Sequence, residues 1–119
     1  MTDGERRFLK ALAERIQPAD VVDAYLFPAF RHGVVETGVA VLATATDAAD
    51  GRYAVLTARY RLDVKGMDRG AWDFDVRREA DAPLDALAEV VHGVTRRAAD
   101  YGAAPLHLDG DAYRAMITA

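Results

Sequence analysis

The sequence contains no cysteine, no serine and no asparagine. Without cysteine, the chain forms no disulfide bond and offers neither a thiolate nucleophile nor a zinc–thiolate site. Covalent mechanisms that use a serine or cysteine nucleophile are therefore excluded. Any catalysis would have to rely on threonine, aspartate, glutamate, lysine, histidine or tyrosine.

The chain also lacks a basic excess and a long apolar run. Its net charge is −4 over 119 residues, so nothing draws it to a nucleic acid backbone. No apolar stretch approaches the roughly 20 residues that span a bilayer, and the first residues do not have a signal-peptide pattern. We expect a soluble cytoplasmic protein without a nucleic acid or membrane partner. Arginine far outnumbers lysine and alanine is frequent, which is typical of GC-rich bacterial coding sequences.

The size and the composition are those of one globular domain. Hydrophobic residues make up 51% of the chain and charged residues 29%, which is ordinary for a water-soluble domain. A chain of this length buries roughly 65% of its unfolded surface and can hold a core without disulfide bonds. We expect residues 1–119 to form a single domain.

Local patterns predict one helix followed by four strands. Thr2 and Glu5 have the spacing of a capping box, and the apolar residues that follow recur with a helical period until Pro18. Four segments with strand character come next, separated by turns that contain glycine. These segments are Val21–Phe30, Val34–Thr46, Tyr53–Lys65 and Trp72–Val76.

The strands are joined by short turns, so they are predicted to pair as one four-stranded antiparallel meander in the order 1-2-3-4. Pro28 lies inside the first strand and cannot donate a hydrogen bond to a neighbour, so this strand is expected at a sheet edge. Pro83 is expected to open a long C-terminal helix that ends at Gly102. With the N-terminal helix, it would cover one face of the sheet, which predicts a two-layer α+β domain.

The tail beyond Gly102 is less regular. Leu106–Leu108 has the character of a short extended segment. Asp109 and Asp111 are both suited to cap a short helix that carries Tyr113, and the sequence leaves the choice between them open.

Charge and ring packing predict the registers of the later strands. A register that opposes Leu62 and Trp72 places each arginine of the third strand against an aspartate of the fourth strand. The second hairpin of the chain opposes Gly38 and Tyr60, and the tyrosine ring is expected to cover the glycine.

Polar residues of the first and third turns gather at one end of the predicted sheet. His32 and Glu36 are candidates for a catalytic acid–base pair there, with Arg31 or Arg69 holding an anion. Turns are also polar because they face water, so mixed charges that pair with one another are the alternative. The candidate ligand-binding residues are Arg31, Tyr60, Arg69 and Trp72.

Glu36 is the most specific of these candidates. A three-residue first turn would oppose Phe30 and Val34, which places Glu36 across from Pro28. Glu36 would then share the core face with Tyr60, and a partly buried carboxylate is expected to have a raised pKa. Alternatively, the carboxylate lies near the strand end and reaches water or an arginine, and a one-residue change of register would remove the prediction.

No metal site and no cofactor are predicted. His107 and Asp109 supply two possible metal ligands, but a metal site needs three or four. Asp73 and Asp75 lie on one strand face and could chelate a hard cation, but arginines of the neighbouring strand are expected to neutralise them. The glycines between positions 66 and 70 lack the spacing and the following helix of a phosphate-binding loop.

The second predicted strand is apolar on both faces, which indicates that both faces are covered. We expect a homodimer or larger homo-oligomer through the outer face, because a monomer would expose a large apolar patch there. Cover by a helix of the same chain is the competing explanation. The expected interface residues are Val39, Val41, Ala43, Tyr53 and Val55.

Two functions follow from these patterns. The first is a self-associating binding or assembly domain without catalytic activity, whose partner is a second copy of the chain or another protein. The alternative is a small-ligand-binding protein or acid–base enzyme with a pocket between the curved sheet and a helix. The two differ in whether a partner closes the sheet or a pocket stays open.

Overall fold

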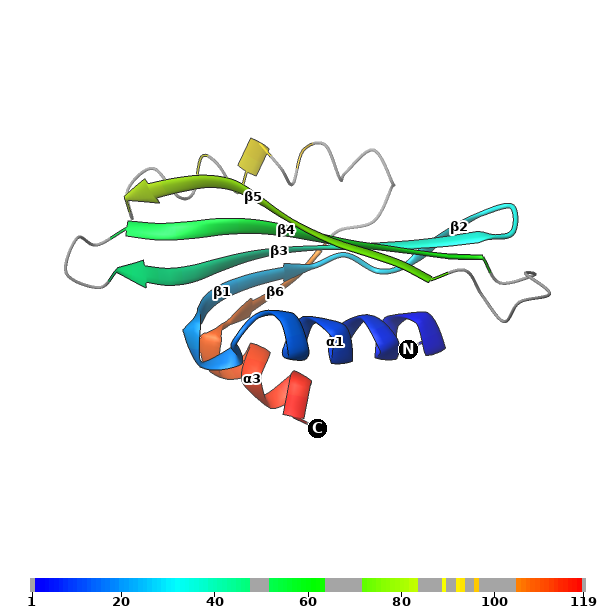
Figure 1. Cartoon of the computed structure of the whole chain (residues 1–119), viewed down its shortest axis with the longest axis horizontal. Coiled ribbons are helices and arrows are strands. Elements are labelled where there is room, and N and C mark those ends of the chain that lie inside the picture. Colours follow the sequence, from blue (N-terminus) through cyan, green and yellow to red (C-terminus); the bar gives the residue numbers. More distant parts are fainter. Residues whose placement is uncertain are drawn as a thin grey trace.

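The computed structural model of the chain describes residues 2–47, 52–63, 72–83, 89, 92, 93, 96 and 105–118. The fold is α+β, as predicted, with an N-terminal helix, an antiparallel sheet and a C-terminal helix. Both helices lie on the same side of the sheet (Figure 1). We call this side of the sheet its inner face and the opposite side its outer face.

Helix α1, Asp3–Arg15, begins with the predicted capping box. The Thr2 hydroxyl accepts a hydrogen bond from the Glu5 backbone N–H at 3.0 Å, and Glu5 Oε1 accepts one from the Thr2 N–H at 2.9 Å. This reciprocal pair satisfies backbone donors that lack a partner within the helix. Phe8 and Leu12 are 5% and 0% exposed, so α1 packs its apolar stripe on the sheet. A short 3-10 helix η1, Pro18–Asp20, leads into the first strand.

In the described part of the chain, the sheet has six strands where four were predicted. The order of the main path is β5-β4-β3-β1-β6, and β2 pairs with β3 beside that path. The four predicted strands are therefore neighbours in the expected order, but the first is divided into β1 and β2, and β6 is added to the sheet (Figure 1). The strands are β1 Val21–Leu26, β2 Phe30–His32, β3 Val35–Asp47, β4 Arg52–Asp63, β5 Trp72–Pro83 and β6 Leu106–Asp109.

The first predicted strand is in fact two strands. Pro28 lies in the break between β1 and β2, where its missing N–H costs no ladder hydrogen bond. The prediction of an edge position is wrong for β1, because β6 pairs with it from Asp23 to Leu26. The extended segment expected near Leu106 thus forms the sheet edge instead.

The first hairpin has a shorter turn than predicted. Phe30 pairs with Thr37, and His32 pairs with Val35, so only two residues form the turn. Gly33, the first residue of this turn, has φ 63°, a conformation that L side chains rarely adopt. The predicted opposition of Phe30 and Val34 is therefore wrong.

The registers predicted for the longer strands are confirmed. Leu62 pairs with Trp72 and Arg61 with Asp73. Gly38 pairs with Tyr60, and a side chain at position 38 would overlap the tyrosine ring atom Cε1. The glycine leaves the space that the aromatic ring fills, as expected.

Strand β5 continues further than the sequence indicated. Pro83 is the last residue of this strand, and the pairing of β5 with β4 is irregular at Leu56, next to Arg78. Most of the predicted helix from Pro83 to Gly102 lies outside the described residues. Its described positions are helical and lie on the outer side of the sheet, away from α1 and α3 (Figure 1). These positions are Glu89, His92, Gly93 and Arg96.

Helix α3, Gly110–Thr118, is the short C-terminal helix that the sequence suggested. Asp109 caps it, because Asp109 Oδ1 accepts a hydrogen bond from the Ala112 N–H at 2.8 Å. Asp111, the other candidate cap, instead pairs with Arg114 at 2.7 Å. Tyr113 is fully buried and anchors α3 against the inner face.

Hydrophobic side chains cover both faces of the sheet. On the inner face, Leu42 and Tyr60 are fully buried together with Phe8 and Leu12 of α1. A second group, which we call the outer cluster, lies on the opposite face because residues alternate along β3. The outer cluster consists of Phe27, Val39, Val41, Ala43 and Val55, with Tyr25 and Tyr53 packed against it.

Candidate functional site

The outer cluster is the surface that the sequence assigned to a homodimer interface. Within one chain, Val39 is 7% exposed, Val41 is 1% exposed and Val55 is not exposed. Ala43 is buried too, and Tyr53 is partly buried. The prediction that a monomer exposes these side chains is wrong, and the competing explanation, cover within the same chain, applies. Helices α1 and α3 do not provide this cover, because they lie on the inner face (Figure 1).

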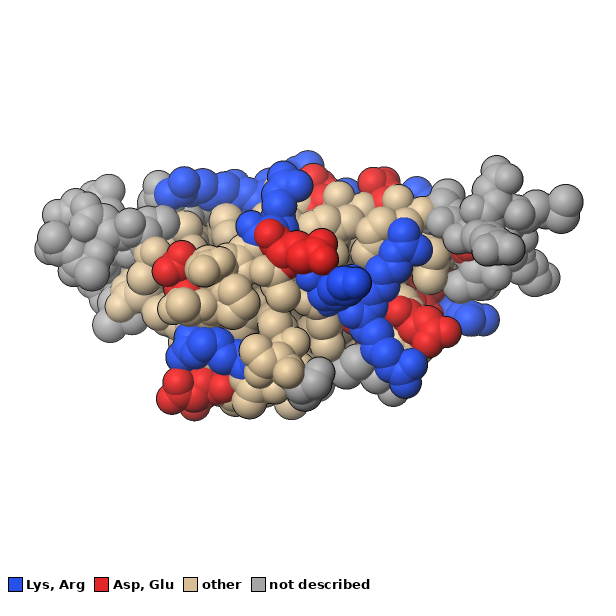
Figure 2. Space-filling view, turned by 60° about the horizontal axis from the view of Figure 1, so that its bottom comes forward, with Lys and Arg blue, Asp and Glu red and all other residues tan. Residues whose placement is uncertain are grey.

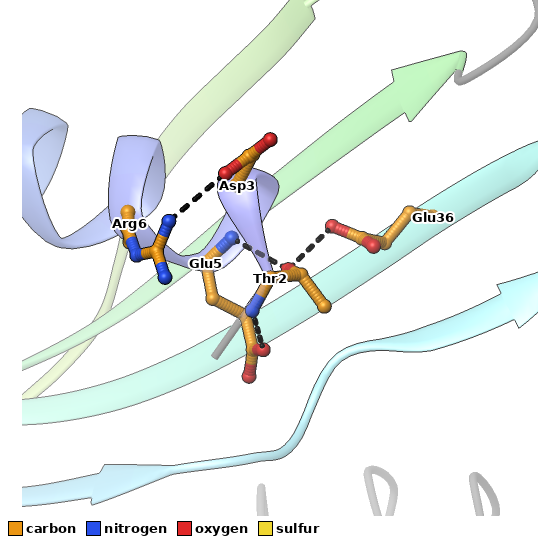
Figure 3. Close-up of polar contacts among 5 residues, drawn as sticks. All are labelled: Thr2, Asp3, Glu5, Arg6 and Glu36. Atoms are coloured by element: carbon orange, nitrogen blue, oxygen red, sulfur yellow. Dashed lines mark hydrogen bonds and ion pairs between the residues drawn. The ribbon is translucent and has the colours of Figure 1, made fainter.

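Glu36 lies on the inner face, where the alternation of β3 placed it. It is 3% exposed, and its Oε2 accepts hydrogen bonds from the Tyr60 hydroxyl at 2.9 Å and from the Thr2 hydroxyl at 3.1 Å. Figure 3 shows Thr2 between Glu5 and Glu36, so the N-terminal cap of α1 rests on this carboxylate. The residue opposite Glu36 is Arg31, and the predicted opposition to Pro28 is wrong.

Gly4 makes this approach possible. A side chain at position 4 would overlap Glu36 Oε2 and would lie 3.2 Å from Tyr60 Cε2. The carboxylate therefore occupies the space beside the first turn of α1, where the positive end of the helix dipole favours a negative charge. Its partners are all side chains that hold α1 on the sheet, which gives Glu36 a positioning role.

Tyr60 is at the centre of an aromatic group on the inner face. Burial, and then the hydrogen bond to Glu36, raise the pKa of Tyr60 far above its ordinary value. Its ring lies 4.7 Å from that of Phe8 and 5.1 Å from that of Trp72, between ring centroids. The Arg7 guanidinium lies 4.4 Å from the centre of the Trp72 ring. Tyr60 and Trp72 are therefore packed against each other, and Tyr60 has no exposed surface to offer a ligand.

His32 and Glu36 do not form the predicted acid–base pair. His32 opposes Val35, whereas Glu36 opposes Arg31, so the two side chains point to opposite faces of the hairpin. Arg31 is exposed on the Glu36 side. Arg69, the fourth candidate for ligand binding, lies outside the described residues.

A pair that the sequence did not suggest joins β1 to β6. His107 Nε2 lies 2.6 Å from Asp23 Oδ1, and the His107 ring stacks on Tyr25 with centroids 4.5 Å apart. Burial, and then the charge of Asp23, raise the pKa of Tyr25. The pair could not be predicted from the sequence, because the two residues are 84 positions apart. They meet only when β6 pairs with β1. An exposed pair of this kind ties β6 to the sheet and contributes little free energy.

The pocket expected between the sheet and a helix exists as a small apolar cavity. It has a volume of about 170 Å³ and lies between α1, the end of β1 and α3. Its ionisable wall residues are Glu5 and Tyr60, and the Tyr60 hydroxyl already donates a hydrogen bond to Glu36. Burial alone would raise the pKa of Glu5, but backbone hydrogen bonds from Thr2 and Ala29 outweigh this effect and lower the pKa. Because Glu5 is already engaged as a cap, this cavity offers no free polar group that would orient a ligand.

A larger groove of about 350 Å³ lies on the outer face, at the end of the sheet that carries β2. Exposed charged side chains of β4 and β5 line it, beside the first hairpin. The sequence predicted that arginines of the neighbouring strand neutralise Asp73 and Asp75, and it made His32 a catalytic candidate and Tyr60 a ligand-binding candidate. The lining residues are Phe30, His32, Val35, Thr37, Arg59, Tyr60, Arg61, Asp73 and Asp75.

Other classes of site find no support in the part of the chain that the structure describes. There, no group of three or more histidine, aspartate or glutamate side chains is arranged to hold a metal ion. None of the described helices is long and apolar enough to cross a membrane. On the face that carries α1 and α3, basic and acidic side chains are interspersed (Figure 2), so this face is not uniformly basic.

Comparisons with protein-family models, with curated proteins and with solved structures found no match. The function is therefore argued from the geometry of this chain alone.

Proposed function

We propose that this protein is a self-associating assembly domain without catalytic activity, and that two copies pair through the edge strand β5. Self-association was expected from the sequence through the outer cluster, but that cluster is covered within one chain. A different surface must therefore carry the contact.

The position of β5 is the observation on which the proposal rests. It is twelve residues long and ends the sheet, with β4 as its one neighbour among the described strands. An edge strand presents a row of backbone N–H and C=O groups to which another strand can bind. Trp72, Phe74 and Val76 are only partly buried on its inner side. Among the described strands, the edge thus combines backbone groups that β4 does not pair with apolar side chains that a partner would cover.

The charges of β5 are complementary to those of a second, antiparallel copy of the same strand, which favours that copy as the partner. Asp73, Asp75 and Arg77 are exposed on the outer face. In an antiparallel pair with a two-fold axis at Val76, Asp75 of each copy opposes Arg77 of the other. This register creates two attractive pairs.

Each neighbouring register brings like charges together. An axis at Phe74 opposes Asp73 and Asp75 twice, and an axis at Arg77 opposes that arginine with its own copy. An axis at Asp75 opposes that aspartate with its own copy, although it also pairs Asp73 with Arg77 twice. Exposed pairs contribute only about 0.2–1 kcal/mol each. The charges therefore choose the register, while backbone hydrogen bonds and apolar contact supply the affinity.

The inner side of the same register is compatible with close packing. Val76 meets Val76 of the second copy, and Phe74 of each copy opposes Arg78 of the other, whose aliphatic stem can cover the ring. The pairing irregularity at Leu56 lies beyond this stretch. Bulges protect sheet edges against unwanted pairing, but this one leaves the residues about the axis, Phe74–Arg78, regular.

Charge reversal tests the proposal. Asp75→Arg alone and Arg77→Asp alone each oppose like charges twice across the two-fold axis, so each should shift a wild-type dimer to monomers. The double variant restores both attractive pairs and should restore the dimer, which makes it the matched control for each single change. Sedimentation velocity of the four proteins measures the outcome. A monomeric wild type, or single variants that associate as well as the wild type, would contradict the proposal.

A further inference from the structure

The groove on the outer face carries two rows of opposite charge. Arg59 and Arg61 project from β4, and Asp75 and Asp73 lie directly opposite them on β5. Residues two apart on a strand are about 6.6 Å apart, and neighbouring strands are about 4.8 Å apart. The groove therefore has a cationic side and an anionic side within the reach of one small molecule.

Within one chain, the four charged groups are available to a ligand. All four side chains are exposed. Among the described residues, no ion pair or side-chain hydrogen bond joins them to one another or to a further group. The sequence predicted salt bridges between the two rows; the register brings the rows together, but the charged ends do not meet.

This charge pattern discriminates between classes of ligand. Paired guanidinium groups suit a carboxylate, which they can bind with two parallel hydrogen bonds. The nearby aspartates would repel a dianion, and the arginines would repel a metal ion. A molecule that carries a carboxylate and an ammonium group a few ångströms apart is attracted by both sides.

Apolar side chains complete the groove. Phe30 and Val35 lie at its hairpin end and are partly buried. The volume of about 350 Å³ is at the small end of the range for ligand sites. It leaves room for one apolar side chain beside the charged groups.

We propose that the groove binds a zwitterionic α-amino acid or short peptide with an apolar side chain. Its carboxylate lies on Arg59 and Arg61, its ammonium group on Asp73, and its side chain against Phe30 and Val35. This site is contained in one chain, so it does not depend on the pairing of β5.

Titration with leucine, N-acetyl-leucine and leucinamide, followed by the backbone amide signals of ¹⁵N-labelled protein, tests the proposal. Leucine has both charges, whereas each analogue lacks one. Leucine should bind at least roughly tenfold more tightly than either analogue, because each loses a charge-assisted hydrogen bond. The perturbed signals should belong to β2, β4 and β5.

Two variants separate the two charges. Asp73→Asn should abolish the preference for leucine over N-acetyl-leucine and leave the binding of N-acetyl-leucine unchanged. Arg61→Gln should abolish the preference for leucine over leucinamide. Arg31→Gln, an exposed change on the opposite face of the hairpin, is the matched control and should retain wild-type binding. Equal affinities for the three compounds, no binding of leucine, or unchanged preferences in both groove variants would overturn the proposal.

Discussion

At the scale of single residues, Glu36 shows what alternation along a strand can and cannot predict. Its parity on β3 places it on the inner face, and it is buried there. Its hydrogen-bond partners were not predictable, since Thr2 lies 34 residues away and reaches it only after α1 docks. The expected acid–base pair with His32 does not form, because Glu36 opposes Arg31 in the hairpin. His32 follows Arg31 and therefore points to the opposite face.

Gly4 provides the first test at this scale. Alanine in place of glycine usually favours a helix by up to about 1 kcal/mol. At position 4, however, the added methyl group would overlap Glu36 Oε2. We expect Gly4→Ala to lower the free energy of unfolding by about 1–3 kcal/mol, as measured by urea denaturation.

Gly93 is the matched control for this change. It is also helical, and a side chain there meets no atom within 4 Å. Gly93→Ala should therefore leave the free energy of unfolding unchanged or raise it. If Gly4→Ala proves as stable as Gly93→Ala, the close contact between α1 and Glu36 does not exist in solution.

The buried tyrosines predict a loss of stability at alkaline pH. Burial raises the pKa of both Tyr60 and Tyr113 above the ordinary value of 10.0, and the hydrogen bond to Glu36 adds to this for Tyr60. The unfolded chain therefore loses these protons first, so their contribution to stability is complete below pH 10 and is lost above it. The free energy of unfolding, measured at increasing pH, should fall once pH exceeds about 10.

Tyr113→Phe isolates one of the two groups. Among the described residues, the Tyr113 hydroxyl is buried without a hydrogen-bond partner, so its removal breaks no bond. The variant should be at least as stable as the wild type at pH 7 and should lose stability less steeply above pH 10. An unchanged slope would show that Tyr113 ionises freely in the folded protein.

At the scale of secondary-structure elements, the sequence predicted most where charge and side-chain size act across neighbouring strands. The arginines of β4 and the aspartates of β5 defined the register between them, and Gly38 defined that of β3 and β4. Pro28 lies between β1 and β2, whereas the sequence pattern predicted one continuous first strand at the sheet edge. The edge position itself depends on β6, and short strands far apart in sequence have no local signal for pairing.

The cap of α3 can be tested at this scale. Asp109 accepts the capping hydrogen bond, whereas Asp111 forms an exposed pair with Arg114. Asp109→Ala should lower the free energy of unfolding by about 0.5–2 kcal/mol. Asp111→Ala should have a smaller effect, since exposed ion pairs contribute little. Equal losses in chemical denaturation would mean that Asp109 is not the cap.

At the scale of the whole molecule, the apolar character of β3 on both faces correctly indicated that both are covered. This apolar pattern does not identify what covers the outer face, because a helix of the same chain and a second copy would bury the same side chains. The structure buries the outer cluster within one chain. This leaves the β5 edge as the surface for the proposed association, and its charge pattern makes that surface complementary to itself.

Mixing the two charge-reversal variants is the most direct test of association through β5. Asp75→Arg protein carries two positive charges at positions 75 and 77, and Arg77→Asp protein carries two negative charges. Across the two-fold axis at Val76, one copy of each would form two attractive pairs, whereas two copies of either would form two repulsive pairs. Sedimentation velocity should therefore show monomers for each variant alone and a dimer for the equimolar mixture. A mixture that remains monomeric, although the wild type dimerises, would show that β5 does not pair in this register.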